Sequence, residues 1–350
     1  MNTLAYCLGK AGYHEEALSM ARQVVSLYRQ LAHTQWSEFA PDLAMSQNNL
    51  AHRLQSKHPK EALEAAEESI RIYRQLGPHI PVPMLPEFAT SLGTLARCLV
   101  AQERCEDALE VIHEGVAVRR RLAHWHANVH VPLLATTLQD LVDVLFRLYR
   151  EADAWRVSQE AIHLYKTYSE ERTGGRAEFE DFLMDIARTY LTHRHATEAL
   201  SIIRELIPVY AERVANTDDR TCIPKYASLL DDAYLCCLSL NMRNDALKFA
   251  QCAATVRGCI CHSWPHADAR PALASTLSGL AYCCRVTDNQ SEALEAAEVS
   301  RSIYEELVAE GNHRFQAALA YAWRDTATAL RALGDDIGAA KARARAEAHS

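Results

Sequence analysis

One short pattern, an acidic residue followed by alanine and usually leucine, recurs along the whole chain. Two weaker copies complete a series of eight, and the central alanines are 45 to 47 residues apart. A period this steady is typical of a repeat array, in which each repeat buries its apolar face against its neighbours. The central alanines, called the anchor alanines below, are Ala17, Ala62, Ala108, Ala154, Ala199, Ala246, Ala293 and Ala339.

Each period contains two helical patterns. In the second repeat, Pro41 is expected to open the first helix, because proline is favoured at the first helical position. The second helix is expected from about Pro59 to Gln75, with an apolar stripe that ends in Tyr73, eleven residues past the anchor alanine. The third and sixth repeats have an arginine there instead, at Arg119 and Arg257. Other prolines expected to open first helices are Pro86, Pro132, Pro224 and Pro271.

The anchor alanine has a steric explanation. Two antiparallel helices joined by a tight turn approach closely near that turn, where a larger side chain would force them apart. The turn itself needs a residue that tolerates a left-handed backbone conformation. Residues of this kind stand five positions before the anchor at Gly12, Asn241, Asp288 and Gly334.

These residues resemble the tetratricopeptide repeat (TPR). Leu4-Ala5-x-x-Leu8, Gly12 and Glu16-Ala17-Leu18 follow its order of large and small residues, and Leu95-Ala96-x-x-Leu99 and Leu280-Ala281 repeat it. The standard TPR has 34 residues, so this longer period is more similar to kinesin light chains and to fungal TPR proteins. The resemblance implies an all-α fold: one solenoid over residues 1–350, a right-handed superhelix of about eight antiparallel helix pairs.

The two ends of the expected solenoid differ. The first repeat begins inside its first helix, which predicts an uncapped apolar surface at the N-terminal end. A missing N-terminal part, a truncated gene model, a covering partner and self-association through this end are the alternatives. Residues 335–350 alternate alanine with charged residues, as expected of a solvated C-terminal cap.

The composition limits the classes of partner and the cellular location that we expect. The formal charge of −8 gives no general basic surface, so we expect no nucleic-acid ligand. The sequence contains no apolar run near 18 residues and no basic segment before an apolar one at its start, so neither a membrane span nor a signal peptide is expected. The eleven cysteines are an odd number, and many have apolar neighbours, which favours buried, reduced thiols and a cytoplasmic location.

In the TPR family the first helices line the concave face and hold ligands. The resemblance therefore implies a peptide or protein partner on this face; the alternative is a solvated wall without a ligand. Its side chains are polar and of mixed charge, suited to an extended peptide. The matching positions are Asn48, His52, Arg97, Gln139, Asp143, Met184, Arg188, Asp231, Ser278, Tyr282, Arg324 and Arg331.

No catalytic motif accompanies the repeats: the sequence has no phosphate-binding loop and no nucleophile elbow. We therefore expect no enzyme activity and no cofactor. The function predicted is a protein-interaction scaffold or adaptor; the alternative is the sensor tail of a signal-transduction (STAND or NB-ARC-like) NTPase. The best metal candidate is the weak cluster Cys259, Cys261, His262 and His266, which follows the predicted helix stop Gly258 and competes with chance clustering in a loop.

Overall fold

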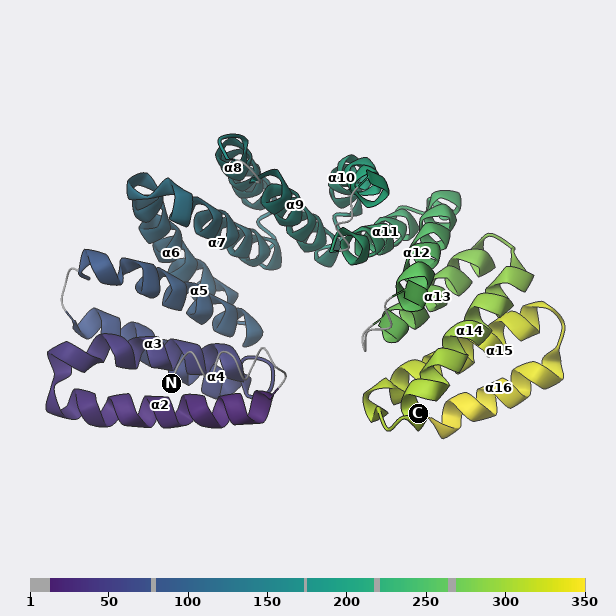
Figure 1. Cartoon of the computed structure of the whole chain (residues 1–350), viewed down its shortest axis with the longest axis horizontal. Helices are drawn as coiled ribbons and strands as arrows, with labels where there is room; N and C mark the ends of the chain where they lie inside the picture. Colours follow the sequence, from purple (N-terminus) through teal and green to yellow (C-terminus); the bar gives the residue numbers. More distant parts are fainter. Residues whose placement is uncertain (1–12, 77–79, 173–174, 217–220, 264–268, 350) are drawn as a thin grey trace. The chain divides into compact units, whose positions relative to one another are not determined.

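The computed structural model describes residues 13–76, 80–172, 175–216, 221–263 and 269–349. The chain divides into two compact units, an N-terminal unit, Met1–Phe182, and a C-terminal unit, Leu183–Ser350. Both are built from helices, with no strand in the described ranges, and the fold is an all-α repeat solenoid (Figure 1).

In the N-terminal unit the helices follow one another with short connections. They are α2 (His14–Thr34), α3 (Trp36–Leu54), α4 (Pro59–Gln75), α5 (Leu85–Ala101), α6 (Cys105–Trp125), α7 (Ala127–Arg147) and α8 (Glu151–Glu170), with a short 3-10 helix η1 (Val82–Met84) before α5. Helix α9 (Gly175–Thr192) contains the boundary between the two units.

The C-terminal unit continues the same alternation. Its helices are α10 (Ala196–Asn216), α11 (Cys222–Ser239), α12 (Arg243–Ser263), α13 (Ala269–Val286), α14 (Gln290–Ala309), α15 (Gln316–Ala332) and α16 (Asp336–Ala348), with a 3-10 helix η2 (His313–Phe315) before α15. The odd-numbered helices from α3 to α15 are called the first helices below, and the even-numbered ones are the second helices.

The anchor alanines lie at the tight contact between the two helices of a repeat. All eight are at most 1% exposed, as the steric argument predicts. The first helix of a repeat packs on its own second helix in the pairs α3/α4, α5/α6, α7/α8, α11/α12, α13/α14 and α15/α16. Second helices such as α6 and α14 also pack on the next first helix. The cap helix α16 buries Ala339, Ala342 and Ala346 on one side.

The turn between the two helices has one conformation in six repeats. The residue five positions before the anchor has a positive φ, between 58° and 86°, which confirms the prediction for Asn241, Asp288 and Gly334. Glu103, Tyr149 and Arg194 take the same conformation although their side chains disfavour it. The backbone bonds are those of a Schellman motif, which satisfies carbonyl groups at the helix end. Gly12 lies outside the described residues.

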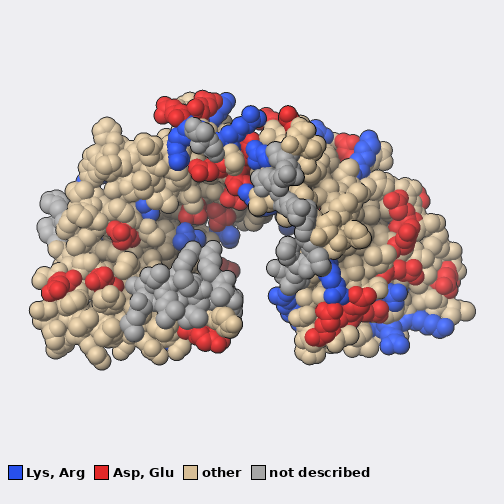
Figure 2. Space-filling model, in the orientation of Figure 1, with Lys and Arg blue, Asp and Glu red and all other residues tan. Residues whose placement is uncertain are grey.

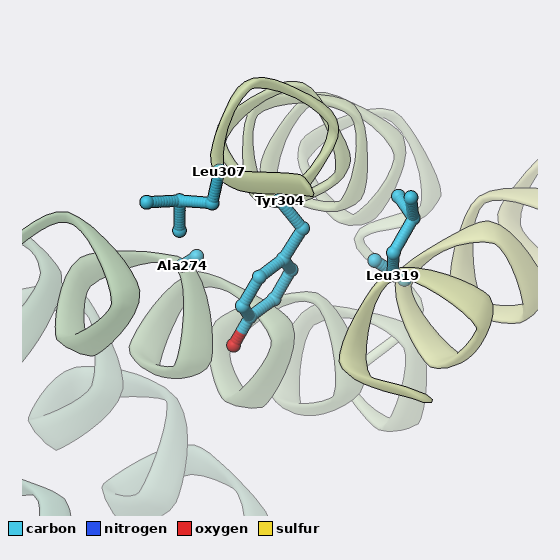
Figure 3. Packing of buried hydrophobic residues seen from close by; sticks show 5 residues of the cluster. Ala274, Tyr304, Leu307 and Leu319 are labelled. Carbon is cyan, nitrogen blue, oxygen red and sulfur yellow. The ribbon is translucent and has the colours of Figure 1, made fainter. Parts of the chain in front are cut away.

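The residue eleven positions past the anchor fills the space between helices. In the seventh repeat, Tyr304 from α14 packs with Ala274 of α13 and with Leu319 of α15 (Figure 3). Tyr73, Tyr165 and Tyr210 are likewise at most 7% exposed. An arginine in this position therefore places a guanidinium group where other repeats have a buried phenol ring.

Three expected helix boundaries are wrong. Pro41 and Pro132 do not open their helices, because α3 and α7 each begin five residues earlier, at Trp36 and Ala127. Ala40, directly before the proline, is completely buried in α3, which favours helix at this position. Gly258 does not stop α12, which continues to Ser263; a single glycine weakens a helix without ending it.

Helix α7 is both long and apolar. By length and composition alone it could cross a membrane, but 61% of its apolar window is buried. It packs against α5, α6 and α8 in the N-terminal unit, as the core helix of a repeat array does.

Candidate functional site

The predicted site residues all lie on first helices. Asn48 and His52 are on α3, Arg97 on α5, Gln139 and Asp143 on α7, Met184 and Arg188 on α9, Asp231 on α11, Ser278 and Tyr282 on α13, and Arg324 and Arg331 on α15.

Their exposure differs: two are buried, six are exposed, and Gln139, Asp143, Asp231 and Ser278 are half-buried. Met184 is 4% exposed and belongs to the helix packing, and Asn48 is 8% exposed. The six most exposed members are His52, Arg97, Arg188, Tyr282, Arg324 and Arg331. The exposed members are thus mainly long polar side chains.

Ion pairs connect successive first helices, a feature that the sequence did not predict. In the N-terminal unit, Nη1 of Arg97 on α5 lies 3.0 Å from a carboxylate oxygen of Asp140 on α7. In the C-terminal unit, Arg188 of α9 bonds Asp232 of α11 at 3.0 Å. Arg285 of α13 bonds Asp325 of α15 at 3.2 Å.

The aspartates of these bridges are desolvated by the helices around them. Burial raises the pKa of Asp140, Asp232 and Asp325, and the partner arginine opposes that rise in each case. The bridges therefore hold the arginines in place and neutralise their charge, so Arg97 and Arg188 are not free anchors for an external anion.

Three other predicted residues have a local hydrogen-bond partner or a shifted pKa. Asp143 accepts a hydrogen bond from Arg147, one turn further along α7, at 2.8 Å. Ser278 bonds Ser300 of α14 at 2.9 Å. Desolvation, and then the charge of Arg97, lowers the pKa of His52, which keeps that imidazole neutral near pH 7.

In the C-terminal unit the first helices form a pocket of about 370 Å³. Two predicted residues, Ser278 and Tyr282, line it. Its remaining walls are mainly aromatic and small side chains from α11, α13, α14 and α15: Tyr234, Leu235, Leu238, Ser275, Gly279, Tyr304, Ala318 and Tyr321. Sequence reasoning missed Tyr234 and Tyr321, because only the packing of successive first helices brings them to one place.

The N-terminal unit has a second pocket, of about 310 Å³, whose lining is mainly apolar but includes several polar side chains. The predicted residue Asn48 is in its wall, with Thr90 and Glu87 of α5, Arg119 of α6 and His130 of α7. The side-chain oxygen of Asn48, the Nε of Arg119 and the Nδ1 of His130 are buried and have no hydrogen-bond partner. All the buried side-chain polar atoms without a partner in the described part of the N-terminal unit belong to this pocket.

The structure separates the described members of the candidate metal cluster. Cys259, Cys261 and His262 lie within α12 rather than in a loop, and His266 is outside the described residues. Cys259 and Cys261 are two residues apart on the helix, which corresponds to a rotation of roughly 200° about its axis, so their side chains point in nearly opposite directions. Cys259 is exposed and Cys261 is half-buried. Within the described ranges, no group of three or more histidine, cysteine, aspartate or glutamate residues could hold a metal ion.

Charges of both signs lie close together on the molecular surface. On the face shown in Figure 2, acidic and basic side chains are interspersed among uncharged ones on each unit, and no broad basic area is visible among the described residues. Binding to a nucleic-acid backbone needs such an area.

Comparison with known proteins identifies the repeat. Residues 43–76, which cover most of α3 and the whole of α4, match the family model of the tetratricopeptide repeat. No curated protein matches the chain in sequence.

Solved structures show the same fold at low sequence identity. The apo form of RapI is 10% identical, with a TM-score of 0.58, and the match covers 99% of this chain and 96% of RapI. BtubC (BKLC) from P. vanneervenii is 17% identical, with a TM-score of 0.55, and the match covers 70% of this chain and 90% of BtubC. A STAND protein with a TPR sensor from Pyrococcus horikoshii is 12% identical with a TM-score of 0.44, over 88% of this chain and 52% of that one; this degree of similarity supports no functional argument.

The matched repeat at 43–76 has the same anchor alanine and the same helix pair as its neighbours along the chain. Residues 43–76 are therefore a tetratricopeptide repeat, and the other helix pairs of the chain share its buried anchor alanine.

Proposed function

We propose that this protein is a non-catalytic, cytoplasmic interaction scaffold that binds a peptide or a protein segment on its first helices. The pocket of the C-terminal unit is the observation that carries the proposal. It combines a concave surface with several tyrosines, and tyrosine is enriched at protein interfaces because its ring is apolar and its hydroxyl can bond.

Two of the tyrosines are accessible to a ligand. The side chains of Tyr282 and Tyr321 are 41% and 58% exposed, although both line the pocket. Leu235, also in the wall, is 44% exposed. An ordinary soluble surface rarely keeps such side chains together, so a partner that covers them would gain buried apolar area and hydrogen bonds.

A glycine gives the pocket its depth. A methyl group added at Gly279 would lie 2.5 Å from the hydroxyl oxygen of Tyr234, so only glycine leaves room for that ring. The bridge between Arg285 and Asp325 holds α13 and α15, which form the two sides of the pocket. Such a site is formed before the ligand arrives, which lowers the entropic cost of binding.

The proposal of a non-catalytic role rests on the sequence, which lacks the catalytic motifs sought. The cytoplasmic location is supported by the thiols of Cys236, Cys237, Cys283 and Cys284, which are free and buried, with pKa values raised by burial. The alternative role, as the sensor tail of a signal-transduction NTPase, has no observation in its favour among the described residues.

Selection from a displayed random-peptide library tests the proposal. The wild type and a double variant, Tyr282→Ala with Tyr321→Ala, are compared with a control variant, Tyr149→Ala. Tyr149 is 90% exposed and lies in a turn of the other unit. We expect the wild type and the control to enrich the same peptides and the double variant to lose them. Enrichment of the same peptides by all three proteins, or of none by the wild type, would refute the proposal.

A further inference from the structure

The pocket of the N-terminal unit contains an arginine in an unusual setting. The side chain of Arg119 is 4% exposed, and no carboxylate lies within ion-pair distance of it among the described residues. One bond is made: its Nη2 donates to the hydroxyl of Thr90 at 2.7 Å. A buried guanidinium is normally paired, because an isolated charge away from water is costly.

The sixth repeat shows how the chain satisfies the same arginine elsewhere. Arg257 stands at the same position relative to its anchor alanine, eleven residues past it. Its Nη2 approaches the hydroxyl of Ser228, 29 residues earlier, at 3.4 Å. Its Nε donates to a carboxylate oxygen of Asp231, 26 residues earlier, at 3.0 Å, and its Nη2 donates to the same oxygen.

The third repeat has the arginine and the hydroxyl but not the carboxylate. Thr90 is 29 residues before Arg119, as Ser228 is before Arg257. The position 26 residues before Arg119, where the sixth repeat has Asp231, is Gly93. The Nε of Arg119 is buried and has no partner, and the equivalent Nε of Arg257 bonds Asp231 in the sixth repeat.

The space beside Gly93 is open to a side chain. A methyl group added there would meet only Nη1 of Arg97, at 3.6 Å, which is an ordinary contact distance. The third repeat therefore has space for a carboxylate beside Gly93 and a cation, the guanidinium group of Arg119, that could bind it.

We propose that the pocket of the N-terminal unit binds a carboxylate of a ligand, which bonds Nε of Arg119 in the place that Asp231 occupies in the sixth repeat. Hydrogen bonds between an arginine and a carboxylate are charge-assisted and directional, so this contact fixes both the position and the charge of the bound group.

Two further residues of the pocket indicate that the carboxylate belongs to a peptide. The side-chain oxygen of Asn48 has no partner, and an asparagine amide can accept a backbone N–H while it donates to a carbonyl. The Nδ1 of His130 also has no partner, and burial and the nearby Arg119 lower the pKa of this imidazole, so that it is neutral near pH 7. This attribution rests on the proposed function, whereas the carboxylate contact itself does not.

One native carboxylate competes with this interpretation. Glu87 lines the same pocket from α5, and its charge acts on Arg119 from beyond ion-pair distance. If Glu87 were the partner of Arg119 in solution, Glu87→Gln would lower the melting temperature. We expect this variant instead to melt at the wild-type temperature and to bind carboxylates more tightly, because it removes a like charge from the pocket.

The main test introduces the missing carboxylate into the chain. Gly93→Asp should melt at a higher temperature than Gly93→Ala, which controls for the loss of a helical glycine. Sodium glutarate, compared with sodium chloride at equal ionic strength, should raise the melting temperature of the wild type and of Gly93→Ala and leave that of Gly93→Asp unchanged. The proposal is overturned by a Gly93→Asp variant that melts no higher than Gly93→Ala, or by one that responds to glutarate as the wild type does.

The sixth repeat provides a reciprocal variant. Asp231→Ala leaves Arg257 with its hydroxyl partner but without its carboxylate, as in the third repeat. This variant should melt below the wild type and recover part of the loss in glutarate. No recovery would mean that an external carboxylate cannot take this place beside the arginine, which would count against the proposal.

Short peptides identify the source of the carboxylate. Acetyl-Gly-Glu-Gly-amide should stabilise the wild type more than glutarate does, and the neutral acetyl-Gly-Gln-Gly-amide should not stabilise it. Asn48→Ala should remove the advantage of the peptide over glutarate. A response to acetyl-Gly-Gly-Gly with a free C-terminus, but not to the glutamate peptide, would assign the site to a terminal carboxylate and would overturn its assignment to an acidic side chain.

The outcomes separate this inference from the proposed function. A response to glutarate that Gly93→Asp abolishes, without peptide binding anywhere on the chain, would leave the carboxylate site intact and refute the scaffold. Peptide binding to the pocket of the C-terminal unit, here called the tyrosine pocket, with no difference in melting temperature or glutarate response between Gly93→Asp and Gly93→Ala, would support the scaffold and refute the carboxylate site.

Discussion

Tyr149 illustrates how much a single backbone angle can cost. Its φ is 58°, and its side chain is 90% exposed, so no packing compensates for the left-handed conformation. A non-glycine residue in this region costs roughly 1–2 kcal/mol. The helix–turn–helix geometry of the repeat imposes the angle whatever residue stands there, which explains why Glu103 and Arg194 adopt it as well.

Tyr149→Gly should therefore stabilise the protein. We expect the free energy of unfolding to rise by about 0.5–1 kcal/mol, since the relief of strain is partly offset by the greater freedom of glycine in the unfolded chain. Urea unfolding, followed by circular dichroism, measures the change. Tyr149→Ala is the control, because alanine retains the β-carbon and should gain nothing; an equal gain from both variants would show that loss of the tyrosine, rather than strain, is responsible.

The bridge between Arg285 and Asp325 should be the most valuable of the three, because it is the most buried. The side chains are 23% and 8% exposed; Arg285 bonds Oδ1 of Asp325, and Oδ2 is buried without a hydrogen-bond partner. Arg285→Ala leaves that carboxylate uncompensated and should lower the free energy of unfolding by roughly 2–3 kcal/mol at pH 7. Asp325→Asn in the same chain should restore part of it.

The pH dependence of stability provides a second test of the loss expected for Arg285→Ala. Burial raises the folded-state pKa of Asp325 above its ordinary value of 3.8, so the folded state binds the proton more tightly than the unfolded state. Stability linked to this group is therefore gained as the pH falls from the raised pKa towards 3.8. The deficit of Arg285→Ala should shrink between pH 7 and pH 5; a deficit that grows on acidification would contradict the assignment.

At the level of the helix pair, the anchor alanine decides how closely the two helices approach. Ala108 is fully buried between α5 and α6. Ala108→Phe should lower the free energy of unfolding by about 2 kcal/mol, because the ring must force the two helices apart. Ala117→Phe, on the exposed face of the same helix, is the matched control. Equal melting temperatures for the two variants would mean that the helices do not pack at the anchor.

The helix pairs were predictable because they depend on local periodicity. The anchors, the left-handed turns at Asn241, Asp288 and Gly334 and the buried tyrosines follow from positions within one repeat. Helix starts were less predictable: Pro41 and Pro132 are tolerated inside helices because burial of their upstream neighbours outweighs one lost hydrogen bond.

Contacts between repeats were the part that the sequence did not reveal. The bridging arginines and aspartates are separated by 43, 44 and 40 residues, so no single short motif contains them. The arrangement beside Arg119 was hidden for the same reason. A signal was present in the comparison of repeats: an arginine replaces tyrosine twice, with aspartate at the matching position in one case and glycine in the other.

For the whole molecule, the pattern of contacts determines how a local defect spreads. Within each unit a helix packs on its neighbours along the chain and on the next helix but one, and the two units have separate internal contacts. The stability of such an array is close to a sum over repeats and their nearest-neighbour interfaces. A substitution should therefore weaken the repeats around it and leave distant ones protected.

Hydrogen exchange measured by mass spectrometry tests this prediction with one alanine-to-phenylalanine substitution at an anchor in each unit. Ala108→Phe should increase exchange in α5 and α6 and, to a smaller degree, in α4 and α7, while α13 to α16 keep their wild-type protection. Ala293→Phe, at the anchor between α13 and α14, should do the opposite. If both variants instead raised exchange in every helix by the same factor, the two units would unfold as one cooperative body, and the nearest-neighbour description would be wrong for this chain. Local spreading would mean that a ligand bound to one pocket stabilises mainly the repeats that form it, so the carboxylate pocket and the tyrosine pocket could bind their ligands independently.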